Sequence, residues 1–197
     1  MPKSASTRSR SWAGVAPDDR RAERRALLLD TAFDLLGTEG WSGTTVRGVC
    51  QAANLNPRYF YESFDDLDAL LIAVYDRLVA ELQAEVEKAV ANAGDDAASQ
   101  VRATVESTVR FVDDDRRRGR VLYSEALGNE ALNKRRVEAG FAVAEVLSRG
   151  RADQRVTASF IVGGFSEVLV AWLDGRIKVS RKRLVEQTTA LFLKVGT

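Results

Sequence analysis

Three side chains in the N-terminal third of the chain, Arg58, Tyr59 and Tyr61, could bind a polar partner. Phe60 and Phe64 lie four residues apart, so a helix here would turn both rings toward a core. That arrangement leaves the arginine and the two tyrosines toward solvent. A guanidinium beside two phenols at the start of a helix can donate hydrogen bonds and stack, which is typical of a surface that contacts DNA.

Two short helices joined by a tight turn would position these side chains. The pattern predicts one helix over 46–53, with a single apolar face, and a second over 57–64. Asn54 lies in the turn and tolerates a positive φ better than other non-glycine residues. Residues favoured at helix starts precede each helix: Thr44 or Thr45 before the first, and Asn56 with Pro57 before the second.

Catalysis and metal binding have few suitable residues. The chain has no histidine and a single cysteine, Cys50, and no glycine-rich phosphate loop follows a strand. We therefore expect no catalytic residues, no metal site and no cofactor. Cys50 could be a redox switch, but its position on an apolar helix face favours a small core residue.

Composition is that of an ordinary globular protein. The chain has 197 residues, 45% hydrophobic and 29% charged, with a net charge of +1. Residues 1–25 hold seven basic and three acidic side chains, so the positive charge is concentrated at the N-terminus. Residues 1–19 are predicted to be a basic flexible arm, either a disordered tail or a segment that touches DNA. No signal peptide and no apolar run of bilayer length is evident, so we expect a cytoplasmic protein without membrane contact.

The region from about residue 22 to 75 resembles the DNA-binding domain of the tetracycline-repressor (TetR) family of bacterial transcriptional regulators. The resemblance covers the rest of the chain only by length and helical pattern. Arg58 stands where a small residue is frequent, and Leu67 replaces a common lysine, so base preference and one phosphate contact should differ. The matching residues are Ala32, Phe33, Leu36, Gly40, Thr44, Thr45, Val46, Ala52, Ala53, Leu55, Tyr61, Phe64, Leu70 and Leu71.

The resemblance implies that the helix beginning at Pro57 enters the major groove of double-stranded DNA. Arg58 would read a base edge, most naturally that of guanine, and Tyr59 would contact the same place. Phosphates would be held by Thr45, Arg47 and Tyr61. The expected DNA-binding residues are Thr45, Arg47, Asn56, Pro57, Arg58, Tyr59 and Tyr61.

Helical patterns continue to the end of the chain, and no strand-like alternation interrupts them. The predicted fold is all-α, with a three-helix DNA-binding domain over 20–66 and an effector-binding and dimerisation domain over 67–197. A solvated junction is expected over 113–118. The helices expected are 20–39, a long helix from 67, one through Val101 to Val112, 120–127, 130–149, 152–174 and 181–194.

The helix over 152–174 is apolar around most of its circumference and must be buried on several sides. In TetR-like proteins the last two helices of two subunits form a four-helix bundle, which implies a homodimer; a central helix of a monomeric bundle is the alternative. The expected interface residues are Phe160, Gly164, Phe165, Val168, Leu169, Trp172, Leu184 and Leu191.

The resemblance also implies a ligand-responsive repressor that a small, mainly apolar effector releases from a palindromic operator, without a metal ion. The alternative is a helical small-molecule or protein-binding module that has lost effective DNA binding, for which Leu67 and the low net charge speak. The expected pocket residues are Tyr75, Leu78, Phe111, Leu122, Tyr123 and Glu125.

Overall fold

A computed structural model describes residues 17–196, and over this range the chain is helical with no strand. The all-α prediction is thereby confirmed. The predicted arm over 1–19 lies almost wholly outside the described residues. In chain order the elements are α1 (Pro17–Thr38), η1 (Trp41–Gly43), α2 (Val46–Ala52), α3 (Pro57–Tyr61), α4 (Leu67–Ala91), α5 (Ala97–Asp114), α6 (Arg116–Gly119), η2 (Arg120–Ser124), η3 (Glu125–Leu127), α7 (Glu130–Ser148), α8 (Ala152–Leu173) and α9 (Arg181–Val195).

Side chains that accept a hydrogen bond from a backbone N–H fix the start of most helices. Asp66 accepts from Ala69 at the start of α4, and Asp96 accepts from Ser99 at the start of α5. Such caps satisfy backbone donors that no helical carbonyl can reach, so the polar residues between apolar segments set the helix boundaries.

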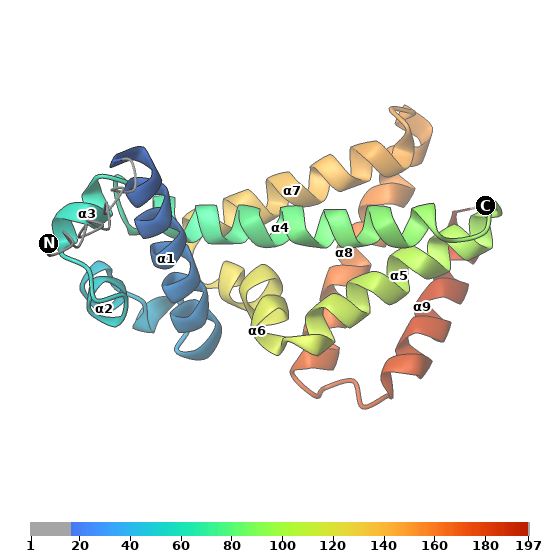
Figure 1. Cartoon of the computed structure of the whole chain (residues 1–197). Coiled ribbons are helices and arrows are strands. Elements are labelled where there is room, and N and C mark those ends of the chain that lie inside the picture. The colour runs from blue at the N-terminus through green and yellow to red at the C-terminus, as the bar shows by residue number, and fades with distance from the viewer. Residues whose placement is uncertain (1–16, 197) are drawn as a thin grey trace, which may run out of the picture.

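Helices α1, α2 and α3 gather at one end of the molecule, and α4 runs from them along the whole body (Figure 1). Helix α4 packs against α5 and α7, α5 packs against α9, and α7 lies along α8. The fully buried side chains form one continuous cluster that includes Leu28 of α1, Phe60 of α3, Leu70 of α4 and Leu169 of α8. The three N-terminal helices therefore share their core with the body.

Four predicted segments differ in the structure. Helix α1 begins at Pro17 rather than residue 20. Helix α3 ends at Tyr61 rather than residue 64, because the chain turns there to place Asp66 as the cap of α4. The expected junction over 113–118 holds the short helix α6, and the expected helix over 120–127 is instead a π-helical turn, η2, followed by the 3₁₀ turn η3.

Helix α8 is long and apolar enough to cross a membrane by length and composition, with 22 residues and a mean hydropathy of 1.7 over its most apolar 18-residue window. The expectation that no apolar segment approaches bilayer length is therefore wrong for this helix. One such helix is weak evidence for a span, since core helices of soluble proteins have the same character. Here α8 packs against α7 and α9.

Two glycines let α6 fit between the N-terminal helices and the body. A methyl group on Gly37 of α1 would lie 2.6 Å from Cβ of Arg117, and one on Gly119 of α6 would lie 2.4 Å from Cδ1 of Leu173 in α8. Both distances are shorter than carbon atoms allow. The close approach of α1, α6 and α8 therefore depends on these two positions lacking a side chain.

We expect Gly119→Ala to lower the free energy of unfolding by about 1–3 kcal/mol, because the added methyl overpacks the contact with Leu173. Gly140→Ala is the matched control, since its methyl would lie 3.7 Å from Val162, an ordinary contact. That control should be neutral or stabilising by up to about 1 kcal/mol. Urea unfolding measures both variants, and equal stability of the two would contradict the tight packing at α6.

Candidate nucleic-acid interface

Helices α2 and α3 are held by local hydrogen bonds that the sequence predicts. Thr45 Oγ1 accepts from the Gly48 N–H at 3.0 Å and caps α2, and Asn56 Oδ1 accepts from the Arg58 N–H at 2.9 Å and caps α3. Asn54, in the turn between them, has a φ of +52°. The prediction that an asparagine provides the left-handed turn residue is confirmed.

Phe60 fixes the orientation of α3. Its side chain is fully buried, and its ring lies 5.2 Å from that of Tyr61 and 5.9 Å from that of Phe64, centre to centre. Burying Phe60 turns the opposite side of this short helix outward, where Tyr61 is 60% exposed. The predicted division of α3 into a core face and a solvent face is correct.

Arginines of α1 hold α3 through Glu62. The Glu62 carboxylate lies 3.1 Å from Arg58 Nε and 3.5 Å from an Arg24 nitrogen, and its backbone carbonyl accepts from Arg21. The Arg24 guanidinium also stacks over the Tyr59 ring at 4.4 Å. The Arg58 side chain is 82% exposed, and an ion pair so exposed is worth little, so Arg58 can leave Glu62 for another partner at small cost.

All seven residues expected to bind DNA are exposed and lie on α2, on α3 or at their caps. Two of them, Thr45 and Asn56, also serve as helix caps. Arg21 and Arg24 were not assigned a place at this surface in the sequence analysis, although the excess of basic side chains over residues 1–25 was noted. Their spacing could have indicated this, since residues three apart lie on the same face of a helix and the two arginines could therefore reach the same neighbour.

Cys50 is buried on the inner side of α2, and burial raises the pKa of its thiol. A raised pKa keeps the sulfur protonated and unreactive at neutral pH. The interpretation of Cys50 as a core residue fits these facts. Within residues 17–196, no group of three or more acidic, cysteine or histidine side chains is arranged to hold a metal ion.

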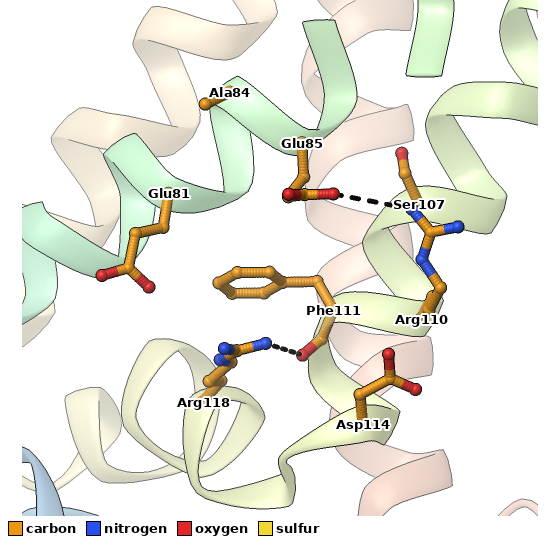
Figure 2. Close-up of a pocket in the computed structure, with 8 residues that line it drawn as sticks. All are labelled: Glu81, Ala84, Glu85, Ser107, Arg110, Phe111, Asp114 and Arg118. Carbon is orange, nitrogen blue, oxygen red and sulfur yellow. Dashed lines mark hydrogen bonds and ion pairs between the residues drawn. The ribbon is translucent and has the colours of Figure 1, made fainter. Parts of the chain in front are cut away.

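The residues expected to line an effector pocket do not converge on one cavity. One hollow, of about 400 Å³, is an open groove between α4 and α5 with Arg118 of α6 at its side (Figure 2), and Phe111 is the one member of the six that lines it. The groove is otherwise polar: Glu85 pairs with Arg110 at 3.6 Å, and Arg118 donates to the Phe111 carbonyl and stacks on its ring at 4.4 Å. Tyr75, Leu78 and Leu122 are buried in the core.

Two of the expected pocket residues are tyrosines at the centre of the body. Burial raises the pKa of Tyr75 to about 12, with a smaller opposing effect from Arg136. Burial, with Tyr75 nearby, also raises the pKa of Tyr123. Both phenols are therefore neutral hydrogen-bonding groups at physiological pH. Glu125 is already engaged, because both of its carboxylate oxygens accept hydrogen bonds from Arg120 or Trp41.

The expected dimer interface divides into exposed and buried residues. Phe160, Gly164 and Leu191 are exposed, whereas Phe165 and Val168 are half-buried against the core. The other three are buried within the subunit itself, and a partner could bury little more of their surface. These three are Leu169 and Trp172 of α8 and Leu184 of α9, and their place in a dimer interface stays a prediction.

An exposed apolar face lies along α7 and α8. Phe160 of α8 is 69% exposed and Val156 79%, and on α7 Phe141 is 65% and Val146 77% exposed. The α7 residues were missed in the sequence analysis. The sequence could have indicated them, because α7 carries apolar residues on a second face besides the one that is buried.

Comparison with known proteins places the chain. A family model described as bacterial regulatory proteins, tetR family, matches residues 28–74. The HTH-type transcriptional regulator BetI of Burkholderia thailandensis is 34% identical over 85 residues, 43% of this chain and 44% of that protein. The aligned segments span about half the length of the curated relatives that the chain matches.

Solved structures match over most of the chain. A putative TetR-family transcriptional regulator from Syntrophomonas wolfei has a TM-score of 0.75 at 14% identity and covers 89% of this chain and 95% of its own. The fatty acid degradation regulator FadR from Bacillus halodurans has a TM-score of 0.73 at 17% identity, covering 91% and 96%. These likenesses show the fold.

Residues 28–74 therefore belong with the tetR family of bacterial regulatory proteins, and the described chain has the fold of TetR-family regulators. The predicted resemblance is confirmed, and with it the arrangement of an N-terminal helix-turn-helix followed by a helical body. The relatives are regulators of transcription rather than enzymes.

The cap of α3 offers a test that separates the stability of the helix from its expected contact with DNA. We expect Asn56→Ala to lower the free energy of unfolding by about 1 kcal/mol, because the Arg58 N–H loses its acceptor. Asn56→Asp keeps an acceptor there and should retain stability, while its negative charge weakens DNA binding. Urea unfolding and DNA titration measure the two effects, and full stability of the alanine variant would show that the cap contributes nothing.

Proposed function

We propose that the protein is a dimeric repressor that binds a palindromic operator through α3 and releases it when a small effector binds. The observation that supports this most is the exposed surface of Arg58, Tyr59 and Tyr61 on a helix anchored by Phe60. A five-residue helix held this firmly presents its side chains with little freedom to lose, which favours specific binding.

Each side chain has a role that its geometry supports. Arg58 exchanges Glu62 for a guanine edge, where it can donate two hydrogen bonds. Tyr59, oriented by Arg24, contacts the neighbouring base, and Arg47 and Tyr61 contact phosphates. Thr45 Oγ1 accepts the capping hydrogen bond, which leaves its own hydroxyl hydrogen free to donate to a phosphate.

The body, over residues 67–197, is proposed to supply dimerisation and effector binding. A second copy of the chain would cover the apolar face of α8 that includes Val156 and Phe160, with Leu191 of α9 at its side. The effector is proposed to be a mainly apolar organic molecule among the central helices, where the neutral phenols of Tyr75 and Tyr123 can orient it. A protein of this kind acts in the cytoplasm, where its operator is.

The test of DNA recognition is selection of bound sequences from random duplex DNA. We expect an enriched inverted repeat, bound with a Kd of about 10⁻⁸–10⁻¹¹ M and weakened steeply by salt. Arg58→Ala should cost about 1–3 kcal/mol at its base pair and relax preference there.

Arg102→Ala is the matched control, since Arg102 is an exposed arginine paired with a glutamate four residues later on α5, as Arg58 is on α3. It should bind the selected duplex as the unmodified protein does. Binding that ignores sequence would contradict the proposal and favour a module that has lost DNA recognition.

Dimerisation is tested at an exposed position, since a charge at buried Leu169 would unfold the subunit. We expect Phe160→Asp to give a folded monomer at micromolar concentration, because the charge lies where the partner's apolar surface would pack. Leu27→Asp on α1, at a side chain 43% exposed, is the control and should leave the dimer intact. Light scattering measures the mass, and a monomer in the unmodified protein would refute this interface.

A further inference from the structure

Contacts between the segment after α6 and the end of α1 join the body to the N-terminal helices. Arg120 Nη1 donates to the carbonyls of Thr38 at 2.7 Å and Gly37 at 3.3 Å. Arg120 Nε donates to Glu125 Oε1 at 2.6 Å, and Glu125 Oε2 accepts from the Trp41 backbone N–H at 2.9 Å. We call Arg120 and Glu125 the joint pair. The pair caps the last carbonyls of α1 and holds the first residue of η1.

The surroundings of the joint pair are closely packed. Gly40 has a φ of +81°, and a methyl there would lie 2.8 Å from Glu125 Oε2. A methyl on Gly128 would lie 2.5 Å from Trp41 Nε1, so the indole rests directly on the backbone after η3. The Glu125 side chain is only 14% exposed. The Arg120 side chain is 40% exposed, but the carboxylate that it binds is sheltered, and charge-assisted hydrogen bonds to a sheltered carboxylate are stronger than those of a surface ion pair.

The π-helical turn η2 is what brings the joint pair together. The Glu125 backbone N–H bonds to the Arg120 carbonyl, five residues back. In an α-helix, residues five apart point about 140° away from each other, so their side chains could not meet this way. Widening the turn by one residue places the two on the same side. Such turns are rare and frequently occur at functional positions.

We propose that Arg120 and Glu125 are positioning residues that set the orientation of α2 and α3 relative to the body, and that η2 is the element through which the central helices act on them. Val121 and Leu122, inside the turn, are buried in the core, so a shift of the central helices displaces the turn directly. In an α-helical register the pair separates. The α1 carbonyls then lose their donor and the Trp41 N–H its acceptor.

The first experiment is hydrogen exchange on the free, full-length protein, read by mass spectrometry. Glu125→Gln removes the negative charge and one of the two acceptor oxygens, so it cannot accept from both Arg120 and the Trp41 N–H, and Arg120→Lys removes the Nε donor. Both changes alter the size of the side chain little. We expect exchange about tenfold faster over residues 39–44 and 120–127, while α5 and α8 exchange as before. Gly128→Ala displaces Trp41 without touching either charge and should speed the same two segments.

Glu138→Gln is the control, since Glu138 pairs with Arg135 within α7 and reaches no N-terminal helix. Exchange over 39–44 equal to that of this control would overturn the proposal. Equal acceleration in every helix would also overturn it, because the pair would then support stability in general rather than position the N-terminal helices.

The second experiment rests on the proposed DNA-binding function and measures affinity for the selected duplex. A loosened α2 and α3 must be ordered on binding, so Glu125→Gln should weaken specific binding about tenfold. The double variant, which carries Glu125→Gln and Arg120→Lys, should bind no worse than either single variant, because the two substitutions act on the same contact. Additive losses would contradict the shared role. If the unmodified protein selects no duplex, the DNA-binding proposal fails while hydrogen exchange still decides the role of the joint pair.

Discussion

The packing of two very short helices against longer ones is the constraint on which the rest of the structure depends. Helix α2 has seven residues and α3 has five, far fewer than a helix needs to be stable alone in water. They persist because Phe60 of α3 and Val49 of α2 are fully buried in the cluster that also includes Leu28 of α1 and Leu70 of α4. The exposed side chains of α3 are therefore only as well placed as this shared core.

Polar caps and apolar spacing made the N-terminal helices predictable from the sequence. Thr45, Asn56 and Asp66 each accept a backbone N–H at the start of a helix, and such caps depend on near neighbours in the chain. The resemblance to the TetR family followed from Thr45 and from the apolar residues of these helices. A hydrogen bond between near neighbours in the chain can be predicted from a short stretch of sequence, which is why the caps of α2, α3 and α4 agreed with expectation.

Features that depend on distant contacts were not predictable in the same way. Helix α8 is apolar on all sides, so its pattern could not tell the inward Leu169 from the outward Phe160. The π turn places Arg120 against the end of α1 and Glu125 against the start of η1, and both contacts lie about eighty residues earlier in the chain. The pattern over 120–127 predicted an ordinary helix because it contains no sign of that partner. Glu125 was expected to line the effector pocket, because nothing in the sequence indicates its hydrogen bond to Trp41.

The length of helix α4 has a mechanical consequence for any movement at the far end of the body. It runs without interruption from Leu67 to Ala91, so its 25 residues form a rod about 37 Å long. Its first turns pack against α1, next to α3, while its last turns lie at the opposite end of the molecule (Figure 1). A tilt of about five degrees about one end moves the other by about 3 Å, close to the rise of one base pair along duplex DNA. The length of the rod thus means that a small tilt at one end corresponds to a displacement of about one base-pair step at the other.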